Sequence, residues 1–417
     1  MSMKMTATNE RFEALDSWRG ICAVMVIIYH FIYIVRLDYL HWSVISNAYL
    51  FVDFFFVLSG FVVCHAYRDR LRSGRHVGGF LLRRVGRLWP LHLAVLFAFM
   101  LAVMAINIYG RHPDNLMIEA GTGNYSLRAL LLNVALLNSM GFYGVAWNGP
   151  AWSIGAEFYT YALFAAVTLL AGARRLVPAA ITVMLLAMGA ILLVAPTYMN
   201  STADYGFIRC IAGFFGGVLT YHLHQRLRHR ALPMATLWEV TVVVLAGLFI
   251  ASVGIGPDEV RPWSVLAPVA FGAAILVFAR EGGMVSVALR TRPLRALGGW
   301  SYSIYLIHMP LLILMAYGIW LYGDVAGVAV RQQVDVLGHA KTLYDLGNPL
   351  LTTALLAGFV GLVIALASFT YTRIEEPWRD RFARVARNYE TRGRSYAPLP
   401  SRSVTGMTVP VRIQRRR

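Results

Sequence analysis

The residues with the clearest chemical potential are a cation and an imidazole on one apolar segment. Arg19 and His30 lie within LDSWRGICAVMVIIYHFIYIV, which has no other strongly polar side chain after Ser17. Ionisable side chains inside a lipid-spanning helix are costly and are usually functional. Eleven positions are about three helical turns, so both side chains face nearly the same way, roughly 16 Å apart along the axis. One helix face therefore carries a permanent cation near one membrane surface and a titratable base deeper inside.

The composition indicates which class of protein positions these groups. The chain has 417 residues, of which 58% are hydrophobic and 14% are charged, whereas soluble domains have about 25% charged residues. The net charge of +17 comes from short loops and the tail, which fits membrane topology rather than nucleic-acid binding. The three cysteines lie in apolar segments, so no disulfide framework is expected. We predict an all-α, polytopic membrane helical bundle with no large soluble domain and with the lipid bilayer as a partner.

Ten segments have about the 20 apolar residues that a membrane-spanning helix needs. The stretch 126–140 is shorter, and we expect an interfacial or re-entrant helix there. The N-terminus lacks the apolar core of a cleavable signal peptide, so the first span is expected to remain as an anchor. The predicted spans are 17–37, 47–66, 89–108, 150–171, 176–196, 206–224, 236–253, 263–280, 300–322 and 350–372.

The distribution of arginine predicts the orientation of the bundle. The loop 67–88 contains seven arginines, and the loops 172–175, 225–235 and 281–299 contain further clusters. The intervening loops are poor in Lys and Arg, so the positive-inside rule places both termini in the cytoplasm. We divide the chain into a transmembrane domain, 1–384, and a basic tail, 385–417, whose composition predicts disorder.

One set of ionisable groups is predicted to share a level in the outer half of the membrane. His30, Asp53, Glu157 and Arg209 come from four different spans, and each lies roughly 10 Å below the outer surface at ~1.5 Å per residue. Isolated charges are expensive there, so these groups are expected to pair. Asp53 and Arg209 fit a substrate site or a structural ion pair equally well. His30, level with Glu157, is the strongest functional candidate.

A second polar layer is predicted on the cytoplasmic side. It contains Arg19, Arg84, Arg87, Tyr302 and His308. Arginines three positions apart on a helix share a face and bind phosphate oxygens in a bidentate manner, as the phosphates of coenzyme A require. The alternative is that the arginines only enforce topology and that the tyrosine and histidine are packing residues.

Six motifs, taken in order, resemble acyltransferase family 3, whose members are membrane proteins that O-acylate bacterial glycans and other acceptors. The hallmark is an arginine, ten intervening residues and a histidine in the first span, here Arg19 and His30. The resemblance covers about residues 11–384. The remaining motifs are VDFFFVLSGFVV with Asp53, RRVGRLWP with Arg84 and Arg87, WSIGAEFY with Trp152, Ser153 and Glu157, SYSIYLIHMP with Tyr302 and His308, and IEEPWR with Glu375.

The resemblance implies a membrane O-acyltransferase in the bacterial inner membrane. It implies acyl-CoA, most simply acetyl-CoA, as a cytoplasmic donor, and a hydroxyl of an extracytoplasmic glycan as the acceptor. Polysaccharide-assembly proteins are further partners that it suggests. No metal is expected.

The resemblance also assigns roles to the candidate residues. His30 is expected to act as a general base or as an acyl-accepting nucleophile, and Glu157 to orient it as the acid of a catalytic triad does. The donor is expected to bind Arg19, Arg84 and Arg87, together with Tyr302 and His308. Asp53, Arg209, Trp152 and Ser153 remain substrate-site or structural candidates.

Two other classes of function remain open at this point. A proton-coupled transporter could use His30, Glu157 and Asp53 as a proton relay. Such proteins usually show internal repeats and broken helices that face each other, and neither is evident in this sequence. A catalytically silent scaffold in a polysaccharide export complex is the third class.

Overall fold

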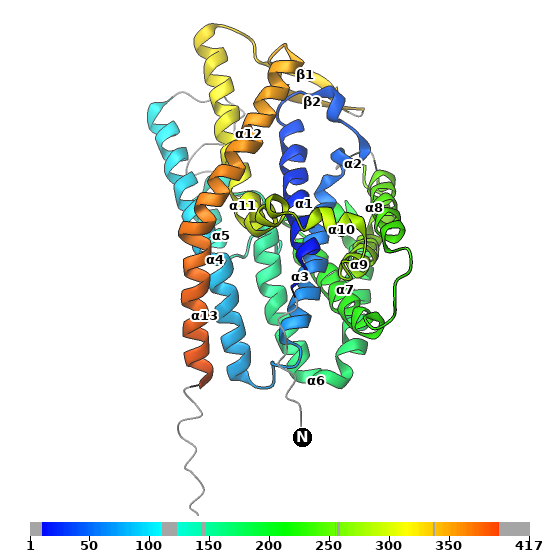
Figure 1. Cartoon of the computed structure of the whole chain (residues 1–417). Coiled ribbons are helices and arrows are strands. Elements are labelled where there is room, and N and C mark those ends of the chain that lie inside the picture. The colour runs from blue at the N-terminus through cyan, green and yellow to red at the C-terminus, as the bar shows by residue number, and fades with distance from the viewer. Residues whose placement is uncertain are drawn as a thin grey trace, which may run out of the picture.

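The structure is a computed structural model that describes residues 11–110, 123–142, 147–254, 256, 259–336 and 338–391. It is an all-α bundle with one small hairpin (Figure 1). α13 ends at the lower end of the bundle in Figure 1, which we call the terminal end, and the hairpin lies at the opposite end. The main helices are α1 (Glu13–Ile32), α3 (Phe51–Tyr67), α4 (Gly74–Tyr109), α6 (Ala151–Val194), α7 (Gly206–Leu227), α8 (Ala235–Ser252), α9 (Ala267–Phe278), α11 (Arg292–Ala326), α12 (Pro349–Thr370) and α13 (Glu376–Thr391).

In the described part of the chain, nine helices are long and apolar enough to cross a membrane. The tenth predicted span, 263–280, corresponds to a shorter apolar segment, Pro262–Phe278. A 3-10 turn (η5, Pro262–Leu266) precedes α9 there, and Pro268 lies in the first turn of α9. Proline starts helices but cannot continue them, so the two prolines shorten this element. The ten predicted spans therefore correspond to nine long helices and one shorter apolar segment.

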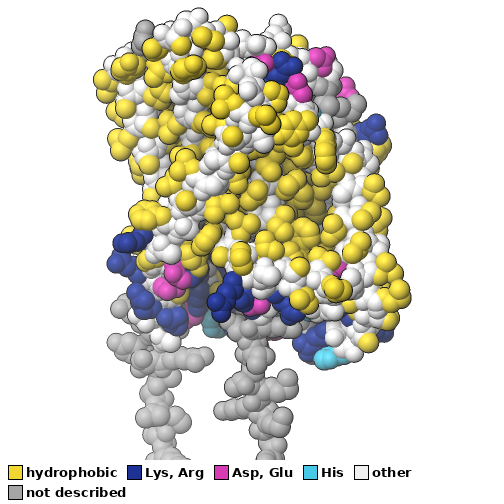
Figure 2. All heavy atoms as spheres, turned by 45° about the horizontal axis from the view of Figure 1, so that its top comes forward, with side chains coloured by type: hydrophobic (Ala, Val, Ile, Leu, Met, Phe, Trp, Pro, Cys, Tyr) yellow, Lys and Arg dark blue, Asp and Glu magenta, His cyan; other side chains and the backbone are white. Residues whose placement is uncertain are grey.

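The surface of the bundle matches a membrane environment. Figure 2 shows a broad band of hydrophobic side chains, with Lys and Arg gathered along its border at the terminal end. Two predicted spans, 150–171 and 176–196, are the two halves of α6, which bends at Gly172 (φ 65°). A positive φ is accessible to glycine at little cost, and this allows the chain to turn back within one continuous element.

The predicted tail begins too early. α12 continues through a π-helical turn (η6, Tyr371–Glu375) into α13, which ends at Thr391. α13 packs against α4, where Arg83 donates two hydrogen bonds to Glu390 at 2.8 and 2.7 Å. A Cβ on Gly86 of α4 would lie only 2.2 Å from Cβ of Phe382, so the two helices approach closely. Residues 385–391 are therefore part of the bundle, and 392–417, the rest of the predicted tail, lie outside the described residues.

Two segments between the spans have defined structure. α5 (Leu127–Val134) is an eight-residue helix, as the short stretch 126–140 predicts, and Trp89 and His92 of α4 hydrogen-bond the Val134 and Asn133 carbonyl oxygens. The loop 323–349 contains an unpredicted antiparallel hairpin, β1 (Arg331–Val336) and β2 (His339–Tyr344). The other short helices are α2 (Ser43–Ser46) and α10 (Met284–Leu289), with 3-10 turns η1 (Asp38–Leu40), η2 (Ala48–Leu50), η3 (Gly123–Tyr125) and η4 (Tyr198–Asn200).

Glycine contacts bring together the helices that carry the candidate site. α1 and α11 lie side by side, and a Cβ on Gly298 would approach the Asp16 carbonyl oxygen to 2.0 Å. α3 and α7 cross where a Cβ on Gly60 would lie 1.9 Å from the Phe214 carbonyl oxygen. Small residues allow such close backbone approach in membrane helices. These contacts hold α1 against α11 and α3 against α7.

Candidate active site

An interior cavity of about 310 Å³ is lined mainly by α1, α3, α4, α6 and α11. It opens near Arg11, whose side chain is 64% exposed. Four arginines and two carboxylates line it, so it has a surplus of two positive charges. We call it the arginine cavity; its charged lining residues are Arg11, Asp16, Arg19, Arg84, Arg87 and Glu157, and Ser301, Tyr302 and Tyr305 are among its other polar residues.

The arginines of this cavity differ in how well they are paired. Asp16 accepts a hydrogen bond from Arg11 at 2.9 Å and lies 3.9 Å from Arg19. Arg84 is held by aromatic rings, with its guanidinium carbon 5.0 to 5.2 Å from the ring centres of Tyr67, Phe80 and Tyr161. Its buried Nε has no hydrogen-bond partner. Among the described residues neither Arg84 nor Arg87 forms an ion pair, so their donors are available to an anionic ligand.

The neighbouring Arg83 provides a contrast on the same helix. It is paired with Glu390 of α13 and does not line the cavity. Arg84 and Arg87, three positions apart on α4, share the face that turns to the cavity, as their spacing predicts. The three arginines of RRVGR therefore divide into one structural ion-pair residue and two cavity residues.

Glu157 lies at a different level from the one predicted. It lines the arginine cavity and accepts a hydrogen bond from Tyr161 at 2.6 Å. The prediction counted depth from the membrane surface, but α6 begins inside the bundle. The preceding Asn148 is fully buried, and its side-chain amide donates to the Leu306 carbonyl oxygen of α11. Because the start of α6 is already buried, Glu157 lines the cavity of the arginines and is not among the residues that line the cavity of His30.

A second cavity, of about 160 Å³, lies next to the first. It contains the His30 side chain, and much of its wall is aromatic. We call it the histidine cavity; its lining residues are Val26, Tyr29, His30, Tyr49, Val52, Gly149, Pro150, Trp152, Asn200, Thr202, Arg209, Tyr305 and Met309. Arg19 and His30 thus lie on one helix, α1, but line two cavities.

Val52 and Tyr305 line both cavities. Tyr305 is held in place by a triangle of polar atoms. Its hydroxyl oxygen lies 2.9 Å from the Ser153 hydroxyl and 3.3 Å from the Pro150 carbonyl oxygen, and Ser153 lies 3.0 Å from the same carbonyl oxygen. Ser153, predicted as a substrate or structural residue, therefore supports the wall between the cavities.

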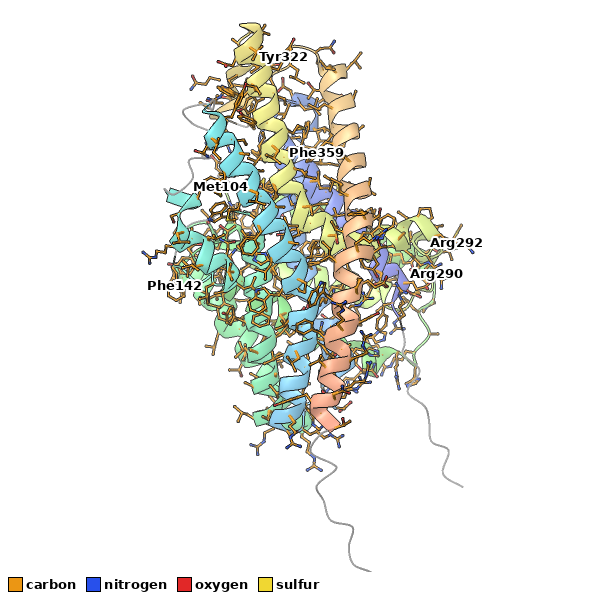
Figure 3. All side chains as sticks on the ribbon, turned by 90° about the vertical axis from the view of Figure 1, so that its left-hand side faces the viewer. Met104, Phe142, Arg290, Arg292, Tyr322 and Phe359 are labelled. Atoms are coloured by element: carbon orange, nitrogen blue, oxygen red, sulfur yellow. The ribbon has the colours of Figure 1, made fainter. Side chains whose placement is uncertain are left out.

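His308 lies against His30 and not with the arginines. Its Nε2 is 3.2 Å from Nδ1 of His30, and its side chain is completely buried. The prediction started the ninth span at residue 300, whereas α11 starts at Arg292. His308 is therefore about 24 Å, rather than about 12 Å, from the start of its helix. Figure 3 shows how far α11 extends, from Arg292 at one end to Tyr322 near the other.

Asp53 and Arg209 form an ion pair beside the histidine cavity, which Arg209 lines. Arg209 donates to both carboxylate oxygens, at 2.9 and 2.7 Å, and to the Tyr49 and Ser201 carbonyl oxygens. Both side chains are almost completely buried. The Trp152 ring covers the guanidinium at 5.3 Å. Because both carboxylate oxygens are occupied, the geometry favours the structural interpretation of this pair.

Tyr302 lines the arginine cavity as predicted, but its hydroxyl donates to the Leu88 carbonyl oxygen at 2.5 Å. Sequence reasoning missed Arg11 because it precedes the first predicted span, and it missed the role of Tyr161. The spacing of four positions between Glu157 and Tyr161 is the signal that predicts their contact on one helix face.

Comparison with known proteins identifies the family. The family model of acyltransferase family 3, described as an acyltransferase domain, matches residues 12–368. The chain belongs to this family. It is also 32% identical over 190 residues to "Protein 2 in picA locus" of Rhizobium radiobacter, a match that covers 44% of this chain and 93% of that protein. No solved structure matches the chain. Family membership confirms the predicted resemblance and favours acyl transfer over a proton-coupled transporter.

Proposed function

We propose that the protein is a membrane O-acyltransferase that moves an acyl group, most simply acetyl, from acyl-CoA to a hydroxyl of an extracytoplasmic glycan. The observation that supports this best is the pair of adjoining cavities. One has surplus positive charge and includes the exposed Arg11 in its lining, and the other contains an imidazole among aromatic side chains. A donor with several phosphates and a neutral hydroxyl acceptor need two sites of these two kinds.

The positive charge at the terminal end supports a cytoplasmic position for both termini, in a bacterial inner membrane. The donor is then in the compartment where acyl-CoA is found, and the acceptor approaches from the hairpin end. Proteins that assemble the glycan are natural partners at that end. The direction of transfer follows from this orientation.

The arginine cavity has the features of a coenzyme A site. Arg84 and Arg87 have no competing ion pair in the described residues, and Arg19 has only a long contact with Asp16. Guanidinium groups bind phosphate oxygens through charge-assisted hydrogen bonds. With the phosphates near the mouth, the pantetheine arm points along the cavity toward Tyr305.

The transfer step places the thioester at the wall between the cavities. Nε2 of His30 takes the proton of the acceptor hydroxyl while the hydroxyl oxygen attacks the thioester carbon. The carbon–sulfur bond then breaks, and the imidazolium returns the proton to the departing thiolate. An alternative route through an acyl-imidazole uses the same nitrogen as the nucleophile. General-base assistance of this type contributes about 10²- to 10⁴-fold to the rate.

In this proposal Glu157 does not orient His30 as the acid of a catalytic triad would. Its neighbours are Tyr161 and the arginine cavity, so its charge acts on the arginines that bind the donor. It limits the surplus positive charge of that cavity and so favours release of coenzyme A after transfer.

The test is transfer of a radiolabelled acetyl group from acetyl-CoA by the purified protein in lipid nanodiscs, combined with mass analysis of the cell-surface glycans. His30→Gln is expected to lower transfer at least about 10²-fold while coenzyme A still raises the unfolding temperature. His92→Gln is the matched control, because His92 is a buried histidine that bonds a backbone carbonyl and lines neither cavity. Near-normal acetylation by the His30→Gln variant contradicts the proposal. So does the absence of any binding of coenzyme A to the wild-type protein.

A further inference from the structure

The hydrogen-bond partners of His30 determine which of its ring nitrogens is reactive. Nδ1 lies 2.9 Å from the Val26 carbonyl oxygen and 3.2 Å from Nε2 of His308. A carbonyl oxygen can only accept a hydrogen bond, and a neutral imidazole has a single N–H. The ring hydrogen of neutral His30 is therefore on Nδ1.

The same reasoning applies to His308. Its Nδ1 lies 2.6 Å from the Tyr305 carbonyl oxygen, so its hydrogen is also on Nδ1. Nε2 of His308 then has a lone pair, and it is this lone pair that lies next to Nδ1–H of His30. The two imidazoles therefore form a directed chain, in which His30 donates to His308 and His308 donates to the Tyr305 backbone.

We propose that His308 is a positioning residue that holds His30 as the Nδ1–H tautomer and leaves Nε2 as the base. This inference rests on the proposed catalytic role of His30. It gives His308 the function that the triad analogy gave to Glu157, with a neutral imidazole in place of a carboxylate. A buried neutral acceptor avoids the desolvation cost of an ionised carboxylate at this depth.

The surroundings of the pair support this assignment. The His308 side chain is completely buried, and its ring centre is 5.0 Å from that of His30. The Tyr305 carbonyl oxygen accepts the hydrogen bond from His308, and the Tyr305 side chain also forms the wall between the cavities. The orientation of His30 is thus coupled to the position of that wall through α11.

The hydrogen bonds from His30 to His308 and to Val26 also stabilise the positive charge that His30 acquires during transfer. When Nε2 of His30 takes a proton, the imidazolium shares its charge through Nδ1–H. Its two acceptors, the Val26 carbonyl oxygen and His308, then face a stronger donor. No ionised partner is needed for this stabilisation.

The test compares two replacements of His308. His308→Gln keeps a side-chain acceptor near the position of Nε2, whereas His308→Met has similar bulk but no acceptor of comparable strength. Loss of one such hydrogen bond is expected to lower kcat about tenfold, because the Val26 carbonyl oxygen still favours the same tautomer. We expect the Met variant to show this loss with the KM for acetyl-CoA unchanged, and the Gln variant to keep most of the wild-type kcat.

Other outcomes separate the two proposals. The positioning role of His308 is overturned if His308→Gln and His308→Met lose kcat equally, or if both keep the wild-type kcat. In either case His30→Gln remains inactive, so the proposed function stands. A Gln variant that folds but is as inactive as His30→Gln overturns it even if the Met variant does not fold. If His30→Gln itself keeps its activity, the proposed function fails first.

Discussion

The two cavities use ionisable side chains in opposite ways. In the arginine cavity, Arg84 and Arg87 are without ion pairs among the described residues, and one of them is caged only by aromatic rings. In the histidine cavity, the charge of Arg209 is cancelled by Asp53 and by backbone carbonyl oxygens. The first arrangement leaves binding capacity for an anionic ligand. The second satisfies its charges internally and leaves a neutral imidazole as the reactive group.

This difference shows that a buried charge by itself does not identify a functional residue. The useful distinction is whether the partners of the charge are part of the protein. Buried ion pairs contribute little to stability when formed but cost several kcal/mol when one partner is removed. Substitutions in the two cavities should therefore separate into losses of folding and losses of ligand binding.

The largest effect is expected from breaking the Asp53–Arg209 pair. Asp53→Asn leaves a buried guanidinium without its counter-charge, so the free energy of unfolding should fall by about 3 to 5 kcal/mol. Thermal unfolding of the purified protein measures this. The double variant Asp53→Leu/Arg209→Met should lose less than the single variant. A stable Asp53→Asn protein with reduced transfer would indicate instead that the pair acts on substrate.

The next largest effect concerns donor binding. Arg84→Gln and Arg87→Gln each remove a charge-assisted hydrogen bond to phosphate, worth about 1.5 to 3 kcal/mol. We expect the KM for acyl-CoA to rise about 10- to 100-fold in each, with the unfolding temperature of the free protein little changed. The steady-state rate as a function of donor concentration measures this.

Arg83→Gln is the matched control for these two variants, since Arg83 lies on the same helix but pairs with Glu390. It should loosen α13 and leave the KM for acyl-CoA unchanged. Equal KM values for all three variants would mean that the RRVGR arginines serve only topology, and the contrast between the cavities would disappear.

The sequence predicted the parts of this site that depend on local spacing. Arg19 and His30 lie on one helix, and Arg84 and Arg87 share one face, because helical periodicity alone determines these relations. The Arg–x₁₀–His motif also led to the correct family. The hydropathy of the segments predicted the spans, and the two prolines of 262–268 explain why one of the ten elements is shorter than the others.

What the sequence did not predict is depth, because depth depends on where each helix starts in space. Glu157 lies with the arginines and His308 lies with His30, the reverse of the expected placement, since α6 begins just after the buried Asn148 and α11 begins eight residues early, at Arg292. The extension of α13 to Thr391 depends on its tertiary contacts with α4. No local pattern encodes such contacts.

The smallest effect is expected at the wall that separates the cavities. Tyr305→Phe keeps the ring between them and removes a hydroxyl that bonds Ser153 and the Pro150 carbonyl oxygen. One neutral hydrogen bond is worth about 1 kcal/mol, so transfer should fall only about fivefold. Tyr305→Ala removes the ring as well, and it should raise hydrolysis of acetyl-CoA in the absence of an acceptor, because water from the histidine cavity then reaches the thioester.

The ratio of hydrolysis to transfer in these two variants is the decisive measurement for the wall. A raised ratio in the Ala variant but not in the Phe variant means that the ring itself keeps water from the donor. An unchanged ratio in both would mean that the two cavities are already continuous during turnover. In that case the distinction between a donor side and an acceptor side would depend on the arginines alone.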